Sequence, residues 1–245
     1  MSIYKKIFVS KKNKSKLFAL LVDPDKQDNN DLLSLIEKSI KAKVDLFFIG
    51  GSLLMDDKLE ECITTIKSKS DIPVVLFPGN SMQISNKADA ILFLSLISGR
   101  NPHTLIGQQV ISAPILKQTN LEIVSTGYML IDSGEATTAS YMSNTTPIPH
   151  AKHNIATATA IAGEMLGLKL IFLDGGSGAK QAISTKMISS VSSQIDIPLI
   201  VGGGIRSAEK AIENCAAGAD IIVVGNAIEK ENGLIAEIAE AIHNF

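Results

Sequence analysis

The sequence predicts an α/β fold, a single-domain (β/α)8 TIM barrel, and three observations lead to this prediction. Short apolar runs alternate with longer amphipathic segments, and eight such strand-helix pairs can be counted. The last three runs, 170–173, 197–201 and 221–224, each meet glycine where the strand ends. The 245 residues suit one barrel over the whole chain, 1–245, because such barrels commonly have about 200–250 residues.

The predicted strands are short runs rich in β-branched and aromatic residues. They comprise residues 17–22, 44–49, 72–77, 90–94, a part of 121–131, 170–173, 197–201 and 221–224. The predicted helices carry apolar residues at helical spacing, as Leu32, Leu35, Ile36 and Ile40 do in the first of them. They comprise residues 31–43, 56–68, 103–117, 155–167, 180–193, 207–217 and 227–243.

Three polar segments interrupt this pattern. Residues 81–87 alone separate the third strand from the fourth. Residues 132–153 are rich in Ser, Thr and Gly, and a loop of this length is a lid, a binding loop or a disordered segment. Residues 11–16 carry four lysines and are interpreted most simply as a solvated loop before the first strand.

The composition predicts a soluble, cytoplasmic protein with a sizeable core. Hydrophobic residues make up 45% of the chain, and no run approaches the roughly 18 apolar residues that stable membrane insertion requires. The formal net charge of −2 gives no basic field, which argues against nucleic acid as a partner. Cys62 and Cys215 lie in predicted helices without CxxC spacing, so we expect two reduced structural thiols.

A doubly wound open sheet is the alternative fold. Such sheets bind dinucleotides through a GxGxxG turn that an acidic residue follows about 20 positions later. None of the glycine turns has this spacing. The barrel is therefore favoured.

The run of Gly202, Gly203 and Gly204 predicts a phosphate site. Glycine lets backbone N–H groups approach an anion closely, and the helix expected from about Ser207 adds unpaired N–H groups and a positive dipole end. A tight turn without ligand is the other interpretation of one such junction. Two more glycine turns, 175–178 and 225–226, fall at neighbouring strand ends, where barrels often bind phosphate.

Polar groups at the ends of other strands predict a metal site and a base. Asp23, Asp25 and Ser52 follow the first two strands and offer the hard oxygen ligands that Mg²⁺ prefers, although Asp-Pro also makes a good turn. Asp174, between the sixth strand and its glycines, is a candidate general base or, alternatively, a helix cap.

These residues resemble the geranylgeranylglyceryl phosphate synthase family, in particular its PcrB-like bacterial branch and the larger of its two sequence groups. The resemblance covers nearly the whole chain and rests on the runs LLVDPDK, FFIGGSLL, IPVVLFPGN, ILFLSLISGRNP, FLDGGSGA, VGGGIRS and VVGNAIEK. It implies a TIM barrel that joins a prenyl diphosphate to the sn-3 hydroxyl of sn-glycerol 1-phosphate and forms an ether lipid precursor. It also implies magnesium as cofactor, and a homo-oligomer, either dimer or hexamer.

The resemblance assigns a role to individual residues. It implies Mg²⁺ ligation by Asp23 and Ser52, and proton abstraction by Asp174. The implied glycerol phosphate site comprises Phe172, Leu173, Asp174, Gly175, Gly176, Ser177, Gly178, Gly203, Gly204, Gly225 and Asn226. The chain departs from the family's usual Tyr-Leu-Glu run, because Phe172 lacks the phenol and Asp174 is one methylene shorter than glutamate.

Two other classes of function stay open. A phosphosugar isomerase-like barrel of amino-acid biosynthesis shares the phosphate turns but does not need the Asp23 and Ser52 pair. A non-catalytic phosphate-binding barrel is compatible with the altered base site. The four histidines show no ligand spacing and are expected in loops or at helix ends. Arg100 is expected to be a solvated or interface residue, and contact with the diphosphate is the alternative. Neither the prenyl chain length nor the choice between dimer and hexamer follows from the sequence.

Overall fold

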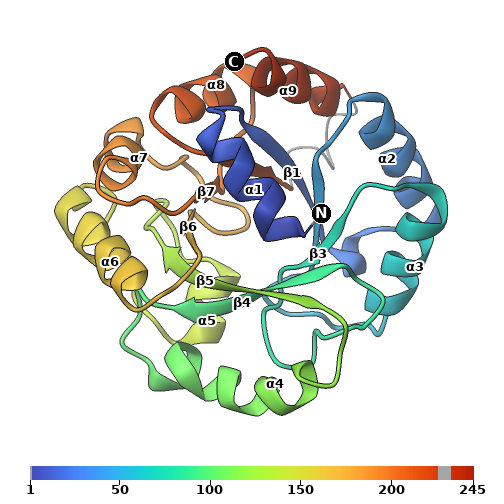
Figure 1. Cartoon of the computed structure of the whole chain (residues 1–245), viewed down its shortest axis with the longest axis horizontal. Helices are drawn as coiled ribbons and strands as arrows, with labels where there is room; N and C mark the ends of the chain where they lie inside the picture. Colours follow the sequence, from blue (N-terminus) through green and yellow to red (C-terminus); the bar gives the residue numbers. More distant parts are fainter. Residues whose placement is uncertain (1, 226–232) are drawn as a thin grey trace.

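A computed structural model of the chain describes residues 2–225 and 233–245, and its eight parallel strands form a closed barrel (Figure 1). The strands follow one another in sequence order, and β8 pairs back with β1. They are β1 (Leu17–Val22), β2 (Leu46–Ile49), β3 (Val74–Leu76), β4 (Ala90–Leu96), β5 (Glu122–Leu130), β6 (Leu170–Asp174), β7 (Leu199–Gly202) and β8 (Ile221–Val224). The predicted barrel is confirmed.

Helices surround the barrel and cover its strands (Figure 1). The α-helices are α1 (Ile3–Lys12), α2 (Asn29–Lys41), α3 (Leu59–Lys69), α4 (Gln108–Leu116), α5 (Thr138–Ser143), α6 (His153–Met165), α7 (Thr185–Ser192), α8 (Ala208–Ala216) and α9 (Leu234–His243). A 3-10 turn, η1 (Pro24–Lys26), follows β1, and one π-helical turn, η2 (His103–Gly107), precedes α4. None of the helices in the described part of the chain has the length and apolar character needed to cross a membrane.

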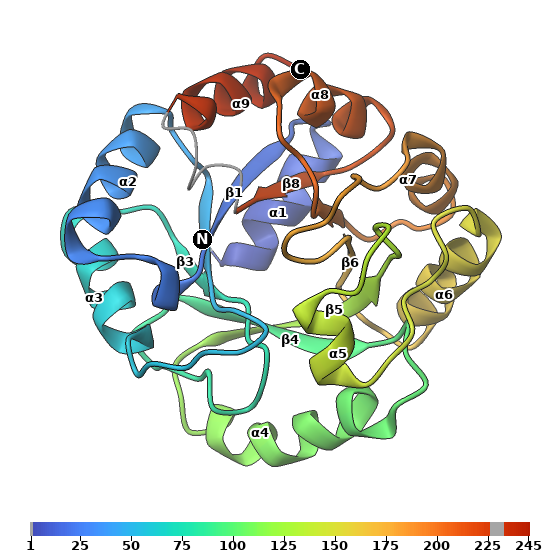
Figure 2. The same ribbon diagram turned by 180° about the vertical axis from the view of Figure 1, so that it is seen from behind.

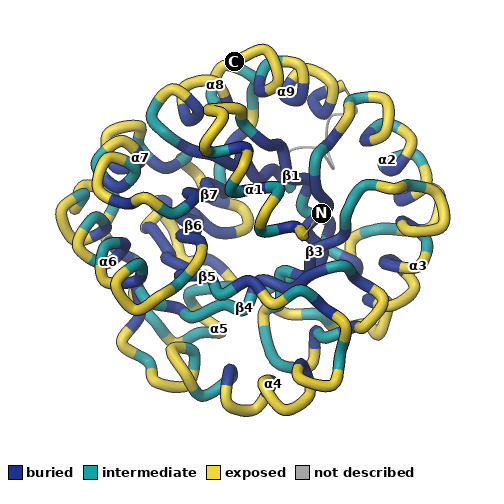
Figure 3. The backbone as a smooth tube through the Cα atoms, viewed as in Figure 1, coloured by how far each residue is buried: buried dark blue, intermediate teal, exposed yellow. Residues whose placement is uncertain are grey.

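The strands separate two layers of core. Successive side chains of a strand point to opposite faces, so Leu46 and Phe48 of β2 fill the barrel while Phe47 and Ile49 pack under the helices. The tube of Figure 3 is accordingly buried along the strands and exposed on the outer side of the helices. Continuous apolar runs are what strands covered on both faces require.

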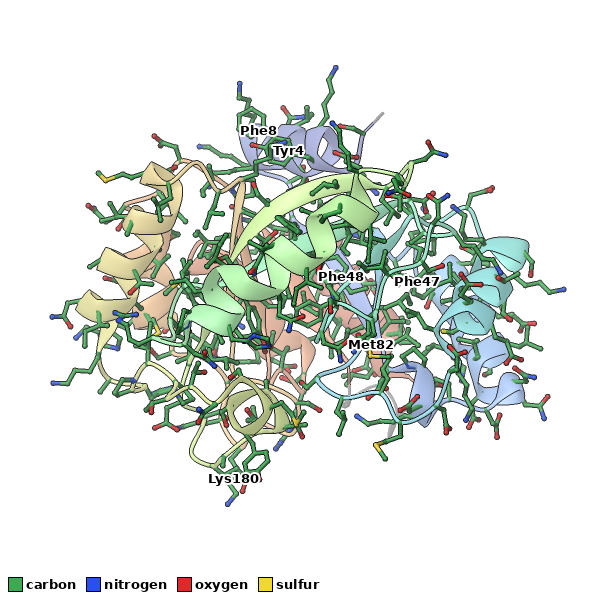
Figure 4. All side chains as sticks on the ribbon, turned by 90° about the horizontal axis from the view of Figure 1, so that it is seen from below. Tyr4, Phe8, Phe47, Phe48, Met82 and Lys180 are labelled. Carbon is green, nitrogen blue, oxygen red and sulfur yellow. The ribbon has the colours of Figure 1, made fainter. Side chains whose placement is uncertain are left out.

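The predicted loop at 11–16 is wrong in its first part, because α1 extends to Lys12 and lies across the end of the barrel where the strands begin (Figure 1). Ile7 of α1 is buried, and Glu122 at the start of β5 accepts the N–H groups of Ile3 and Tyr4. In the side view of Figure 4, Tyr4 and Phe8 mark this closed end, whereas Lys180 lies at the opposite end. The lysines at 11 and 16 are not simply solvated, since both pair with Asp220.

Three aspartates connect neighbouring strands at the same end of the barrel. Asp45, Asp89 and Asp220 each directly precede an even-numbered strand, β2, β4 and β8. Their carboxylates accept backbone N–H groups from the start of β1, β3 and β7, at Phe18 (3.0 Å), Val74 (2.8 Å) and Leu199 (2.9 Å), respectively. Each carboxylate thereby provides an acceptor for a buried backbone N–H group, which would destabilise the fold if it had no hydrogen bond.

The opposite end of the barrel departs from a regular strand-helix alternation. Residues 77–89 are all described and contain no helix, so the count of eight strand-helix pairs is wrong after β3. The segment 132–153 is ordered as the short helix α5 and a β-bridge between Ile131 and Ile148, and α5 lies over this end in Figure 2. The predicted helix at 180–193 starts only at Thr185, and 226–232 lies outside the described residues.

Candidate active site

Two cavities lie at the carboxyl ends of the strands. The first, called the polar cavity here, has a volume of about 240 Å³ and is bounded by the turns after β1, β2, β6, β7 and β8. The second, called the apolar cavity, has about 280 Å³ and extends between β4 and α4, lined by Ile91, Phe93 and Leu116 among others. Gly51, Ser52, Phe77 and Tyr128 line both cavities, so the two meet at these residues.

Most of the predicted site residues surround the polar cavity. They are Asp23, Ser52, Phe172, Asp174, Gly176, Ser177, Gly178, Gly203, Gly204 and Gly225. Leu173 instead points outward into the core under the helices, as alternation along β6 requires. The N–H of Gly175 is donated to the carbonyl of Gly202 (3.1 Å), and Asn226 lies outside the described residues.

The glycine turns after β6 and β7 are in close contact. Gly203 has a φ of +84°, and a Cβ there would lie 2.6 Å from the nitrogen of Gly175, closer than any side chain allows. Helix α8 begins just beyond, with Ser207 capping it by accepting the N–H of Lys210. A concave glycine backbone beside a helix N-terminus is a suitable site for a phosphate group.

Asp174, the last residue of β6, is buried and accepts two hydrogen bonds. Its Oδ1 accepts the N–H of Gly176 (2.8 Å), and its Oδ2 accepts the hydroxyl of Tyr128 (2.6 Å). The phenol that position 172 lacks is thus present on the neighbouring strand, where Tyr128 is the register partner of Phe172. Each carboxylate oxygen keeps a second lone pair, so Asp174 can still accept a bond from a ligand.

Burial dominates the electrostatics of this pair. It raises the pKa of the Asp174 carboxyl above its ordinary value, while the hydrogen bonds from Tyr128 and Gly176 act in the opposite direction. The pKa of the Tyr128 phenol is also raised well above its ordinary value, first by burial and then by the neighbouring carboxylate. Tyr128 therefore remains a hydrogen-bond donor, and Asp174 has a more basic carboxylate than an exposed aspartate.

Asp23 and Ser52 lie on the same side of the polar cavity. A Cβ on Gly51 would lie 3.4 Å from the carboxyl carbon of Asp23, so the turn that carries Ser52 packs directly beside this carboxylate. Oδ1 of Asp25 is buried without a hydrogen-bond partner in the described structure. These hard oxygen atoms fit Mg²⁺, which proteins usually bind through one or two carboxylates together with substrate phosphates.

Two cations also line the polar cavity. Nζ of Lys26 lies 3.1 Å from Oδ2 of Asp23, and Arg206 donates a hydrogen bond to the carbonyl of Ala179 (2.8 Å). The cavity thus combines cations, backbone N–H groups and carboxylates, as a site for an anionic ligand that undergoes proton transfer requires. Among the described residues, no group of three or more His, Cys, Asp or Glu side chains could hold a metal.

The apolar cavity also has polar lining residues, among them Thr104, Gln108, Gln109 and Ser112. Nε2 of Gln109 donates to the carbonyls of Leu94 and Thr104, which fixes the amide, and its Oε1 is buried without a partner in the described structure. The part of the wall that β4 contributes is apolar and consists of Ile91, Leu92, Phe93, Leu94 and Leu96. A cavity of this kind suits a hydrocarbon chain.

Tyr128, Phe77, Lys26 and Arg206 belong to the site although the sequence analysis did not select them. Lys26 and Arg206 lie in the runs LLVDPDK and VGGGIRS, next to the predicted site residues. Their positions in the sequence could therefore have indicated that they belong to the site. Tyr128 lies within a long strand whose register with β6 cannot be deduced from one sequence. Only the parallel pairing of β5 with β6 places its hydroxyl on Asp174.

Both the sequence and the fold of this chain match those of known proteins. The chain is similar to the geranylgeranylglyceryl phosphate synthases of Chitinophaga pinensis (59% identical, covering 96% of this chain and 94% of the relative) and Spirosoma linguale (52%, covering 94% and 92%). A crystal structure of (S)-3-O-geranylgeranylglyceryl phosphate synthase from Thermoplasma acidophilum, in complex with its substrate sn-glycerol-1-phosphate, superposes with a TM-score of 0.94 at 31% identity and covers both chains fully. The PcrB family matches residues 10–242, and this chain belongs to that family.

Proposed function

We propose that this protein is a phosphoglycerol geranylgeranyltransferase, which joins geranylgeranyl diphosphate to the sn-3 hydroxyl of sn-glycerol 1-phosphate through an ether bond. The names of its relatives and the substrate bound to the Thermoplasma enzyme support this activity. The observation that carries it is the junction of a polar and an apolar cavity beside the buried carboxylate Asp174. A small dianion and a long hydrocarbon chain can therefore meet at one base.

Glycerol phosphate binds in the polar cavity in this proposal. Its phosphate lies among the turns at 176–178, 203–204 and 225, and Arg206 contributes positive charge nearby. The free primary hydroxyl then points toward Asp174. Fixing the phosphate and the nucleophile at two separate points selects one enantiomer of glycerol phosphate.

The reaction transfers an allylic carbon from a diphosphate oxygen to the hydroxyl. The carbon–oxygen bond breaks with both electrons going to the diphosphate, and an oxygen lone pair of the hydroxyl forms the new ether bond. Asp174 takes the hydroxyl proton, and Tyr128 holds the carboxylate in place during the transfer. The apolar cavity holds the prenyl chain and excludes water, which would otherwise compete for the carbon.

Asp23 and Ser52 are the proposed magnesium ligands, with Asp25 beside them. Mg²⁺ bound there supplies positive charge that stabilises the departing diphosphate. We expect Asp23→Asn to lower turnover by orders of magnitude and to abolish the binding of Mn²⁺, used as a paramagnetic probe, while the thermal unfolding temperature stays close to that of the original protein. Unchanged Mn²⁺ binding would exclude Asp23 as a ligand.

The decisive experiment incubates the protein with a series of prenyl diphosphates and each enantiomer of glycerol phosphate, and identifies the lipid products by mass. We expect an ether product with sn-glycerol 1-phosphate and little with sn-glycerol 3-phosphate. Equal rates with the two enantiomers would overturn the proposed binding mode. An isomerase would turn over phosphosugars in the presence of EDTA, and a non-catalytic barrel would bind phosphate esters without product.

We also propose that the protein works as a homo-oligomer in the cytoplasm. Ile106, Val110, Ile111 and Ile115, on η2 and α4, are each about half exposed or more and form an apolar surface suited to another copy of the chain. The free, buried thiols Cys62 and Cys215 fit a reducing compartment. Sedimentation of the protein with and without Val110→Glu tests the interface, because a charge at its centre should release monomers.

A further inference from the structure

The boundary between the two cavities is the place where the reacting carbon must lie, if the proposed function holds. This carbon joins the prenyl chain in the apolar cavity to the diphosphate near Ser52, and it has to reach the hydroxyl in the polar cavity. Only four residues line both cavities in the described structure, namely Gly51, Ser52, Phe77 and Tyr128. Two of the four, Phe77 and Tyr128, have aromatic side chains.

These rings belong to a fixed aromatic group. The ring of Phe77 stacks on Phe172 with centroids 5.2 Å apart, and it meets Tyr128 edge-on at 5.7 Å. Tyr128 is also edge-on to Phe172 at 5.6 Å. The backbone also holds Phe77 close to the turn after β2. Its N–H is donated to the carbonyl of Ile49 (2.8 Å), and its own carbonyl occupies the space where a Cβ on Gly50 would lie.

The chemistry at this boundary creates a cation. When the diphosphate leaves with the bonding electrons, positive charge develops on the allylic carbons, in a place that water should not enter. An aromatic ring stabilises a nearby cation through the negative face of its π system, without a nucleophilic atom that could capture it. The hydrogen bond from Tyr128 to Asp174 increases the electron density of the phenol ring and strengthens this effect.

We propose that Phe77 is a catalytic residue whose ring, together with that of Tyr128, stabilises the allylic cation as the diphosphate departs. Phe77 is only partly buried and lines both cavities, so it lies beside a substrate that extends from one cavity into the other. Phe48 provides the comparison, since its ring lies 6.4 Å from that of Phe77 but is fully buried and lines neither cavity.

The test replaces Phe77 by phenylalanine analogues with one, two and three ring fluorine atoms, which weaken the π face while keeping its shape. The single-turnover rate with sn-glycerol 1-phosphate and geranylgeranyl diphosphate should fall stepwise along the series. Phe77→Leu, which has no ring, should lose roughly 2-fold to 30-fold in rate, as expected for one cation–π contact. The KM for glycerol phosphate should stay the same.

The same fluorine series at Phe48 is the matched control and should leave the rate unchanged. A rate that does not depend on fluorination at Phe77, or that falls equally at Phe48, overturns the proposal. Because every rate is measured relative to the product formed by the unmodified protein, absence of product from that protein would instead refute the proposed function.

Discussion

The two ends of the barrel treat polar groups in opposite ways. At the end where the strands begin, Asp45, Asp89 and Asp220 each accept a backbone N–H from the neighbouring strand, and α1 covers the opening. Four of the described residues have a buried side-chain atom without a hydrogen-bond partner. Three of them, Asp25, Gln109 and Ser133, lie at the other end. One end therefore stabilises the fold, whereas the other leaves polar groups for ligands, as in barrels generally.

Asp174→Asn, at the end that carries the site, should have the largest effect on activity. We expect kcat to fall by about 10²–10⁴-fold, because the proton acceptor is lost, with glycerol phosphate affinity within a few fold. Asp174→Glu should keep most activity. A variant that loses binding but retains single-turnover chemistry would show that Asp174 positions the ligand instead.

The same variant should also make the fold more stable. Burial raises the pKa of Asp174 in the folded protein. The contribution of this carboxyl to the free energy of unfolding is therefore fully present below the unfolded pKa and is lost as the pH rises through the folded pKa. Above the folded pKa the buried carboxylate is ionised and therefore unfavourable, and the amide removes this charge. We expect a gain of about 1 kcal/mol, or roughly 2–4 °C in Tm, measured by thermal unfolding.

Asp220→Ala tests the opposite end. This buried carboxylate pairs with Lys11 and Lys16 and accepts the N–H of Leu199, so its removal should cost about 3 kcal/mol in the free energy of unfolding. Turnover by the folded protein should be unchanged. Asp56→Ala is the control, since its pair with Lys58 is exposed and should contribute less than about 1 kcal/mol. Equal losses in both variants would contradict the stabilising role of this end.

Tyr128→Phe should have a smaller effect than Asp174→Asn and should depend on pH. The phenol lowers the pKa of Asp174, so its loss should move the acid limb of the kcat profile to higher pH. The rate at neutral pH should fall roughly tenfold, as for a hydrogen bond to a charged group. The other charged groups that line this cavity, Asp23, Lys26 and Arg206, are the same in the variant and in the original protein, so they do not cause the expected change. Tyr141→Phe, an exposed tyrosine on α5, serves as control, and a profile that moves equally there would reject the assignment.

The smallest effect is expected for the thiols, which belong to neither end. Burial raises the pKa of Cys62 to about 12 and that of Cys215 to about 11, so little reactive thiolate exists at neutral pH. Alkylation of the native protein should be slow at both, as followed by mass spectrometry, and rapid in denaturant. Rapid labelling of the native protein would indicate that α3 or α8 opens readily.

Much of the fold could be predicted from sequence because its signals are local. The apolar runs gave all eight strands, and the glycine turns indicated which end carries the site. Residues 11–16 were misinterpreted because α1 extends to Lys12, and because Lys11 and Lys16 pair with Asp220, more than 200 positions away in the chain. Tyr128 was missed for the same reason, since its role depends on the register between two strands. Pairings across the barrel are not encoded in any single stretch.

The aspartates before β2, β4 and β8 also suggest how the barrel is divided into modules. Each of them connects a strand pair at its start, β1–β2, β3–β4 and β7–β8. The fourth pair, β5–β6, has Lys169 at the corresponding place, and this pair carries Tyr128 and Asp174. The pair without such an aspartate is thus the one that carries the proposed base, whereas Asp23, Ser52 and Phe77 follow strands of the other pairs. A designer could exchange β5–β6 for a pair with another base and keep the rest of the barrel.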